Sequence, residues 1–382
     1  METFSCICDT YIEPGTRVLV RADCNVPLSG GTIDPEGISR LQALLPTLEY
    51  LRSAGARIII ISHLGSDGSA SLKPVAEYMN TTMRIPVGFI PEVISDRVKT
   101  MIESLPFGGM LMLENIRSVN GEMSNDAEFA KQLAGYADIY VNEAFSASHR
   151  KHASIVGVPQ YIPAYSGIHF EKELQYLTQL LEPEQPFVLV VGGAKFGTKL
   201  DLIQSFLPRC SNIIVGGALA HSFYKNRGQS IGVSLVDTTV DVSSFDTEKI
   251  LVPDTVQILR NGTVGDVTLE QITETDNIID ISEKGNTHIW ESLKSAKTIL
   301  WNGPFGYYEG GYTAGTELLA KTITKTSAQT VIGGGDTVTV ISGLKMEKQF
   351  DFVSMAGGAM LDFLLSGTLP GIEALEKKID VK

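Results

Sequence analysis

The feature that most constrains the fold is an alternation between short apolar segments and longer segments with helical periodicity. The apolar segments are rich in β-branched residues, and their near-continuous apolarity is typical of parallel strands buried on both faces. They lie at 17–23, 57–62, 110–115, 138–144, 186–193, 212–218, 298–304 and 329–336, and the helix-length stretches include 37–54, 126–137, 197–208 and 314–326. This alternation predicts an α/β fold with doubly wound parallel sheets.

The length of 382 residues predicts two domains rather than one. Between the two sets of strands, residues 168–187 place apolar side chains at a spacing that gives one helical stripe, which Pro183 and Pro186 end. The stripe consists of Phe170, Leu174, Leu177 and Leu181. We interpret this segment as a helix that connects two lobes.

Charge and composition exclude several classes of protein. The net charge of −13 argues against a nucleic-acid-binding protein, which normally presents a basic face. It leaves room for a small anionic ligand, because a few local cations can dominate one cleft. No segment is long and apolar enough to span a membrane, and residues 1–15 lack the pattern of a signal peptide. We therefore expect a cytoplasmic protein.

The four cysteines, Cys6, Cys8, Cys24 and Cys210, are too few for a disulfide scaffold at this length and fit a reducing compartment. The pair Cys6-x-Cys8 resembles half of a metal site, but no second Cys/His pair completes it. The interpretation that we favour for the cysteines is buried structural thiols.

The two halves of the chain differ at the carboxyl ends of the predicted strands, where open α/β sheets bind ligands. The second half has glycines there, which let backbone N–H groups approach a phosphate at a helix N-terminus. They are Gly192-Gly193, Gly216-Gly217, Gly333-Gly334-Gly335 and Gly357-Gly358. The first half has polar side chains instead, namely Arg21, Asp23, Asn25, His63, Arg117, His149, Arg150 and His152. This contrast predicts a polyphosphate site in one lobe and a small-anion site in the other, although tight packing explains any single glycine pair equally well.

The segment GGAKFGTK at 192–199 follows a predicted strand and begins a predicted helix. Its two lysines stand four residues apart, at a spacing that allows one helical face. The segment is not a P-loop, because the G-x-x-x-x-G-K-[ST] spacing is missing.

Taken together and in order, the motifs resemble those of the phosphoglycerate kinase family. They are RVLVRADCNVPL, SHLG, LENIR, VNEAFSASHRKHAS, GGAKFGTK, WNGPFGYYE, GGGDTVTV and LPGIEAL, and they extend from Arg17 to about Leu375. The resemblance implies two Rossmann-like three-layer lobes with parallel sheets, a cleft between the lobes and a connecting helix. The implied division is an N-terminal 3-phosphoglycerate lobe at 1–167, a helix at 168–185, a C-terminal nucleotide lobe at 186–366, and a tail at 367–382 that packs on the first lobe.

The resemblance implies a set of residues for each substrate. Those for 3-phosphoglycerate are Arg21, Asp23, Asn25, Arg40, His63, Leu64, Gly65, Ser66, Arg117 and Arg150. Those for ATP or ADP are Gly192, Gly193, Lys195, Lys199, Gly216, Gly217, Asn302, Pro304, Glu309, Gly334, Gly335, Asp336 and Thr337. Arg40, Arg150 and Lys195 are implied as catalytic, Glu309 as the ribose ligand, and Asp336 as the residue that positions Mg²⁺. From the residues alone, Arg40 reads as a solvated helix charge, and Asp336 and Thr337 stand where a helix N-cap is expected.

Phosphoryl transfer needs alignment and positive charge around the phosphoryl oxygens, which these residue types supply. The acceptor carboxylate has an intrinsic pKa of about 4 and needs no general base at neutral pH. The expected partners are the small-molecule substrates, and the expected state is a monomer.

The sequence departs from the family pattern at several positions. Ser66 replaces an arginine that contacts the substrate phosphate in the family, and Met355 and Ala356 replace a threonine and a glycine. Two alternatives therefore stay open: a related kinase that acts on another small carboxylate, and a nucleotide-binding regulatory protein without turnover.

Overall fold

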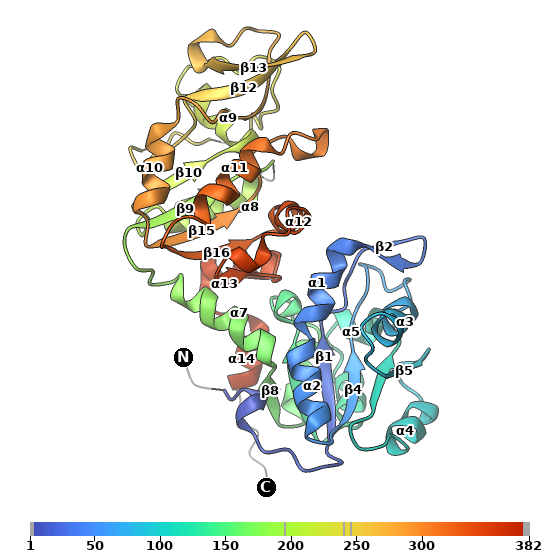
Figure 1. Cartoon of the computed structure of the whole chain (residues 1–382). Helices are drawn as coiled ribbons and strands as arrows, with labels where there is room; N and C mark the ends of the chain where they lie inside the picture. Colours follow the sequence, from blue (N-terminus) through green and yellow to red (C-terminus); the bar gives the residue numbers. More distant parts are fainter. Residues whose placement is uncertain (1–3, 195, 240, 245–246, 377–382) are drawn as a thin grey trace. The chain divides into compact units, whose positions relative to one another are not determined.

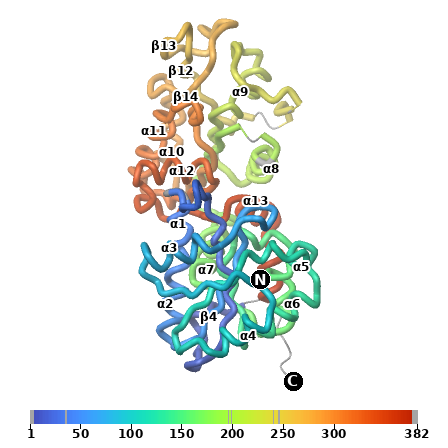
Figure 2. The backbone as a smooth tube through the Cα atoms, turned by 90° about the vertical axis from the view of Figure 1, so that its right-hand side faces the viewer, coloured from blue at the N-terminus to red at the C-terminus, as the bar shows by residue number. Residues whose placement is uncertain are grey.

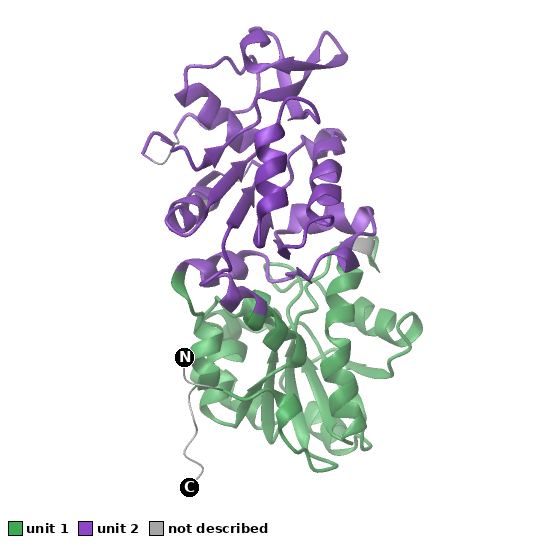
Figure 3. Ribbon diagram, turned by 60° about the vertical axis from the view of Figure 1, so that its left-hand side comes forward, with its two compact units in different colours: residues 1–175, 366–382 green, residues 176–365 purple. Residues whose placement is uncertain are grey.

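The computed structural model describes residues 4–194, 196–239, 241–244 and 247–376. The chain forms two units, one of residues 1–175 and 366–382 and the other of residues 176–365 (Figure 3). The division falls within helix α7 (Ile168–Gln179), which ends four residues before Pro183. The chain thus leaves unit 1 within α7, and its last segment, residues 366–382, again belongs to unit 1.

Unit 1 is built on a sheet of six parallel strands in the order β5-β6-β4-β1-β7-β8 (Figure 1). The strands are β1 (Arg17–Ala22), β4 (Arg57–Ile61), β5 (Val87–Ile90), β6 (Met110–Leu113), β7 (Ile139–Glu143) and β8 (Ala164–Ser166), beside a small hairpin of β2 (Leu28–Ser29) and β3 (Thr32–Ile33). Side chains of β1, β4 and β6 are almost fully buried, as expected for central parallel strands covered on both faces.

The connections in unit 1 contain helices α1 (Pro35–Ala43), α2 (Leu45–Ser53), α3 (Lys73–Thr81), α4 (Asp96–Glu103), α5 (Asn120–Met123) and α6 (Ala127–Ala134). Short helical turns are η1 (Ile7–Asp9), η2 (Ile116–Ser118), η3 (Phe145–Ala147), η4 (Ala153–Gly157) and η5 (Val158–Gln160). The last helix, α14 (Pro370–Glu376), packs in this unit, where the N–H of Gly371 donates to the carbonyl of Ser148 at 2.8 Å.

Unit 2 repeats the architecture with a second sheet of six parallel strands in the order β11-β10-β9-β15-β16-β17. The strands are β9 (Phe187–Val191), β10 (Asn212–Val215), β11 (Ile250–Leu251), β15 (Thr298–Asn302), β16 (Gln329–Gly333) and β17 (Phe352–Val353). The helices are α8 (Phe196–Phe206), α9 (Gly217–Asn226), α10 (Thr287–Ser295), α11 (Ala314–Ile323), α12 (Gly335–Gly343) and α13 (Gly358–Ser366), with short turns η6 (Leu269–Gln271), η7 (Tyr308–Gly310) and η8 (Glu347–Gln349). The predicted α/β fold with parallel sheets is confirmed.

Unit 2 also contains an antiparallel sheet that the sequence analysis missed. It consists of β12 (Thr255–Arg260), β13 (Thr263–Thr268) and β14 (Asn277–Ile281), and lies at the end of the unit remote from α13 (Figures 1 and 2). Its hairpin turns at Asn261-Gly262, both with positive φ. Asn-Gly between two β-branched runs is the strongest short-range hairpin signal, so the sequence did contain the information.

One predicted helix is two helices in the structure. The stretch 37–54 breaks at Leu44, and α2 starts with Leu45 and Pro46. Proline has no N–H to bond the carbonyl four residues earlier, so α1 cannot continue through this point.

The prediction of buried free thiols holds for Cys24 and Cys210 and is wrong for the other two cysteines. Cys6 and Cys8 form a disulfide, and Cys8 is exposed. The short turn η1 brings their Cα atoms to 5.2 Å, within the range that a disulfide spans.

Candidate active site

In unit 1, Arg21 and His63 meet at the carboxyl ends of the neighbouring strands β1 and β4. Arg21 is fully buried, and each nitrogen group of its guanidinium donates within the protein. The acceptors are Ser154 Oγ at 3.0 Å, the carbonyl oxygen of Ala22 at 2.7 Å and His63 Nδ1 at 2.9 Å. Because arginine only donates, Nδ1 of His63 must accept, so the imidazole proton lies on Nε2. Arg21 therefore holds His63 in one tautomer.

Electrostatics keep His63 neutral. Burial lowers the pKa of its imidazole far below the ordinary value, and the positive charges of Arg21, Arg117 and Arg150 lower it further. A neutral imidazole with its proton on Nε2 offers one hydrogen-bond donor, which suits an anionic oxygen.

Arg117 has the clearest unfilled hydrogen-bonding capacity in unit 1. It lies in η2 after strand β6, is 8% exposed, and donates from NH1 to the carbonyl of Gly65 at 2.6 Å. Its Nε and NH2 are buried and have no hydrogen-bond partner in the part of the chain that is described. Burial lowers the pKa of this guanidinium to about 10, and Arg150 and Arg21 contribute to the shift. A buried, unsatisfied cation beside other cations is costly, and a bound anion would remove that cost.

Asp23, which follows strand β1, binds three neighbouring groups in this site. Its carboxylate pairs with Arg40 in the last turn of α1 and accepts a hydrogen bond from the hydroxyl of Ser146 at 2.5 Å. It also accepts the N–H of Asn25 at 3.2 Å. Arg40 is half-buried, so its interpretation as a solvated helix charge is wrong. The ion pair fixes the guanidinium of Arg40 next to the strand ends.

The loop after β4 contains Leu64, Gly65 and Ser66, and side chains from elsewhere hold it. The amide of Asn115 donates to the carbonyls of Leu64 at 2.7 Å and Ala70 at 2.8 Å, and its oxygen accepts the N–H of Leu64 at 3.3 Å. Leu64 is buried, whereas Gly65 and Ser66 are exposed. The side-chain oxygen of Asn25 accepts the N–H of Gly65 at 2.9 Å, which ties this loop to the end of β1.

Arg150 and its neighbours lie beyond η3. Arg150 is exposed, and its Nε donates to His149 Nε2 at 3.2 Å. Burial lowers the pKa of His152, and the charges of Arg117 and Arg150 add to the shift, which brings the pKa to about 4, so His152 is neutral at physiological pH. The surroundings of these groups are cationic, in agreement with a site for an anion.

Several buried residues that were not predicted from the sequence support this site. Glu122 is fully buried and accepts the N–H and hydroxyl of Ser154 at 2.9 and 2.7 Å. Ser154 in turn accepts a hydrogen bond from Arg21, so a chain of bonds leads from Glu122 to His63. Glu122, Ser154 and Asn115 look ordinary in the sequence, and only their contacts show what they hold.

In unit 2, several of the predicted nucleotide-binding residues meet at the carboxyl ends of β9, β15 and β16. Lys199 in α8 is 8% exposed, and its Nζ donates to the carbonyl of Asn302 at 3.3 Å. The hydroxyl of Thr337 accepts the N–H of Gly303 at 2.7 Å. Lys195 lies outside the described residues. The helix N-cap is Gly334, which places Asp336 and Thr337 in the first turn of α12 and makes the expected capping position wrong.

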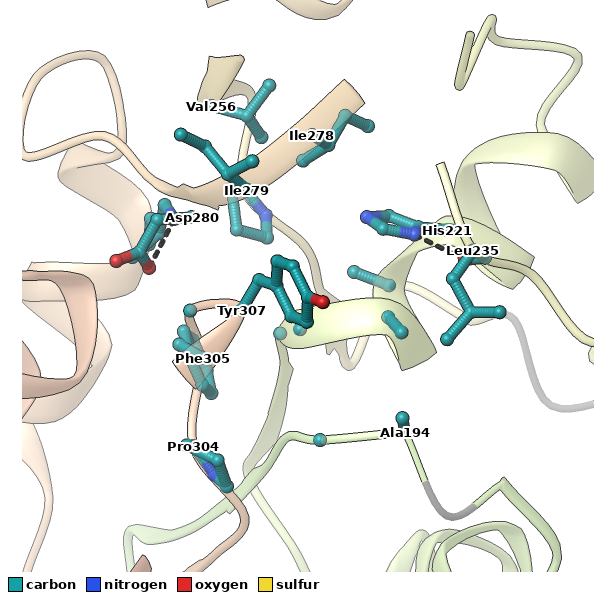
Figure 4. A pocket seen from close by; sticks show the side chains of 18 of the residues that line it. Ala194, His221, Leu235, Val256, Ile278, Ile279, Asp280, Pro304, Phe305 and Tyr307 are labelled. Carbon is teal, nitrogen blue, oxygen red and sulfur yellow. Dashed lines mark hydrogen bonds between the residues drawn. The ribbon is translucent and has the colours of Figure 1, made fainter. Parts of the chain in front are cut away.

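A cavity of about 530 Å³ opens beside these strand ends (Figure 4). This is within the usual range for small-molecule sites. Six of the predicted nucleotide-binding residues line this cavity: Gly193, Gly216, Gly217, Pro304, Glu309 and Asp336. Six other predicted residues do not line it: Gly192, Lys199, Asn302, Gly334, Gly335 and Thr337. The remaining walls are largely apolar and include Tyr224, Val256 and Ile278, which the sequence analysis did not identify.

Packing explains two of the glycines. A Cβ on Gly192 would lie 2.2 Å from the carbonyl oxygen of Pro304, and one on Gly216 would lie 2.5 Å from the ring of Phe305. At Gly335, the first residue of α12, a Cβ would meet nothing within 4 Å. Open space beside a helix N-terminus is where an anionic group is stabilised by the helix dipole.

The residues present fit a magnesium nucleotide. Asp336 supplies a hard carboxylate oxygen on the cavity wall, and Mg²⁺ usually takes one or two protein carboxylates together with substrate phosphates. Within the described ranges, the one group of three or more His, Cys, Asp and Glu ligands at metal-binding spacing is Cys6, Cys8 and Asp9. The first two are joined in the disulfide, and all three lie in the other unit.

A cluster of cationic side chains in one parallel α/β unit and a cavity of small-molecule size in the other are the features expected of a two-domain α/β phosphotransferase. The profile of the family "Phosphoglycerate kinase" matches residues 9–367. The chain belongs to the phosphoglycerate kinase family.

Relatives and solved structures agree. The chain is 38% identical over 382 residues to a phosphoglycerate kinase of Borrelia hermsii, with 95% of this chain and 97% of the relative covered. It is 36% identical to one of Wolbachia, with 98% of each covered. The structure of phosphoglycerate kinase from Coxiella burnetii superimposes with a TM-score of 0.84 at 31% identity, covering 98% of this chain and 99% of that one. In the described part of this chain, no helix combines the length and apolarity needed to cross a bilayer.

Proposed function

We propose that the chain catalyses the reversible transfer of the acyl phosphate of 1,3-bisphosphoglycerate to Mg-ADP, which gives 3-phosphoglycerate and ATP. The observation that carries the proposal is Arg117, whose two buried unpartnered nitrogens lie in the cationic site of unit 1. A small substrate with a carboxylate and a phosphate would satisfy them, and Arg favours such oxygens because its planar group can bind two at once.

We assign the triose substrate to unit 1. Arg117 and the Nε2–H of His63 would donate to the substrate, and Arg40, Asn25 and Gly65 would line its site. Arg21 is buried with its nitrogens already bonded, so it would act by fixing His63 rather than by touching the substrate. Exposed Arg150 would bring positive charge to the transferring phosphoryl group.

We assign the nucleotide to unit 2. Gly193, Gly216 and Gly217 would let it approach the backbone, and Glu309 would bond the ribose hydroxyls. Lys199, near the end of β15, and the first turn of α12 would stabilise the phosphates. We also assign Lys195 to the transferring phosphoryl group, and this assignment rests only on the resemblance of its motif to that of the family. Bound magnesium, held by Asp336, would add positive charge at the phosphate oxygens.

The chemistry requires no proton abstraction. The carboxylate of 3-phosphoglycerate is ionised at neutral pH and attacks the γ-phosphorus directly. What the protein contributes is alignment of the two reacting groups and charge that is fixed before the reaction. We further propose that the chain acts as a monomer in the cytoplasm; the buried free thiols of Cys24 and Cys210 support a reducing compartment, while the Cys6–Cys8 disulfide does not.

The test is an assay that couples ADP formation to NADH oxidation, with Mg-ATP and a panel of small carboxylates. We expect 3-phosphoglycerate to be used with the highest kcat/KM, and omission of Mg²⁺ to abolish turnover. A higher kcat/KM for another carboxylate would favour the related-kinase alternative. Nucleotide binding without turnover on any carboxylate would favour the regulatory one.

A further inference from the structure

His221 has a fixed tautomer that the proposed function does not use. It lies in α9, is 5% exposed, and lines the cavity of unit 2. Its Nδ1 lies 2.6 Å from the carbonyl oxygen of Leu235. A carbonyl oxygen cannot donate, so Nδ1 carries the proton of the neutral ring, and Nε2 has a lone pair.

The ring of His221 extends toward the cavity. In Figure 4, Nδ1 turns to Leu235, and the opposite edge of the ring faces the space between Tyr307 and Ile278. None of the described residues forms a hydrogen bond with Nε2. Burial lowers the pKa of His221, and the hydrogen bond to Leu235 opposes this shift only in part. At neutral pH, Nε2 therefore accepts a hydrogen bond and cannot donate one.

The wall around His221 suits the base of a nucleotide better than its phosphates. Val256 and Ile278 are buried apolar side chains on this wall, and they lie across the cavity from Ala194 and Pro304 (Figure 4). Gly193, which suits a phosphate, lies beside Pro304, and Asp336, which suits a metal, lies in the first turn of α12. The base of a nucleotide is flat and weakly polar, so it fits the apolar part of the cavity beside Val256 and Ile278.

Few other side chains on this wall can distinguish one base from another. The hydroxyl of Tyr224 already donates to the carbonyl of Pro253 at 2.9 Å. The amide of Asn277 offers both a donor and an acceptor, so it tolerates either kind of base edge. His221 offers an acceptor alone, and a buried acceptor that meets another acceptor loses its hydrogen bond and is repelled.

We infer that His221 selects the base: its Nε2 accepts a hydrogen bond from the exocyclic amino group of adenine and disfavours bases with a carbonyl oxygen at that position. The inference rests on the proposed function, since it takes the cavity to be the nucleotide site. It adds a specificity-determining residue, which touches the base and takes no part in phosphoryl transfer.

The test measures equilibrium binding by calorimetry, on the full-length chain with Mg²⁺. The three ligands differ only in the base: ADP has the amino group, purine riboside diphosphate has a hydrogen there, and inosine diphosphate has a carbonyl oxygen. For the wild type, we expect purine riboside diphosphate to bind about 2- to 10-fold more weakly than ADP, the range for one hydrogen bond. Inosine diphosphate should bind more weakly still.

The variant His221→Phe keeps a ring and removes the acceptor. We expect it to lose about 2- to 10-fold in affinity for ADP and to bind purine riboside diphosphate as the wild type does, so that the preference disappears. The control is Ser222→Ala, on the neighbouring α9 residue, which is buried and does not line the cavity. It should keep the full preference.

Two results would overturn the inference. One is a His221→Phe variant that folds, as judged by its Tm, and keeps the wild-type preference. The other needs no variant: wild type that binds all three nucleotides equally contradicts the role of His221 and leaves the proposed function intact. A chain that binds none of them contradicts the proposed function and the inference with it.

Discussion

At the residue scale, Arg117 combines a cost to folding with a proposed use in binding. Its lowered pKa means that the folded protein destabilises its charged form relative to the unfolded chain. We expect Arg117→Met to raise the KM for 3-phosphoglycerate by about 10- to 100-fold, from the loss of charge-assisted hydrogen bonds worth about 1.5–3 kcal/mol. The KM for ATP should stay unchanged, and Tm should stay level or rise. Steady-state kinetics and thermal unfolding measure these effects.

The control for Arg117 is Arg97→Met, which removes an exposed arginine paired with Glu92 at the surface. Surface pairs contribute little, so both KM values should stay close to wild type. An Arg117→Met enzyme with unchanged KM for 3-phosphoglycerate would show that the unpartnered guanidinium has no role in substrate binding.

Ser66 is exposed in the loop after β4. The motif that this loop resembles has an arginine at the position of Ser66. We expect Ser66→Arg to lower the KM for 3-phosphoglycerate by about 10-fold, and added salt to weaken the gain because the loop is exposed. Ser66→Gln, which adds length without charge, should change little. Equal KM values for the wild type, Ser66→Gln and Ser66→Arg would mean that the serine does not weaken binding.

At the element scale, Asn115 holds the loop that presents His63 and Gly65. Asn115→Ala would leave backbone groups of Leu64 and Ala70 without partners, at a cost of about 1–3 kcal/mol in unfolding free energy. We expect faster amide hydrogen exchange at 62–72 and a higher KM for 3-phosphoglycerate. Asn80→Ala is a matched control, because Asn80 makes three similar bonds to Ala76 and Val87. If both variants raise this KM equally, the effect is general destabilisation.

The elements also show what the sequence can and cannot predict. Strand β1 was predictable because its central residues Val18, Leu19 and Val20 form a continuous apolar, partly β-branched run, and all three are buried. The hairpin at Asn261-Gly262 was predictable from the Asn-Gly pair between two β-branched runs, although it was not predicted. Glu122 and Asn115 were not predictable, because a buried polar residue is recognised by partners that lie far away in the sequence. The pairing of Arg21 with His63 follows from the register of β1 and β4, which only the fold provides.

At the scale of the whole molecule, the proposed substrates bind to different units. Direct transfer requires the reacting atoms to approach within about 3–3.5 Å, so we expect the reacting complex to be closed around both substrates. With 3-phosphoglycerate and a non-hydrolysable ATP analogue together, we expect a smaller radius of gyration than with either alone, as measured by small-angle scattering. The Arg117→Met variant should need a higher concentration of 3-phosphoglycerate to reach this smaller radius of gyration. One radius in all four ligand states of the wild type would argue against closure.

The most direct test of the central claim is to identify the phosphorylated product. The wild-type chain is incubated with 3-phosphoglycerate and Mg-ATP in the presence of hydroxylamine, which converts an acyl phosphate into a hydroxamate. We predict one hydroxamate for each ADP formed, and none when 3-phosphoglycerate is left out. Formation of ADP without hydroxamate would mean that the phosphoryl group goes elsewhere, and would contradict the assignment of the substrate carboxylate as its acceptor.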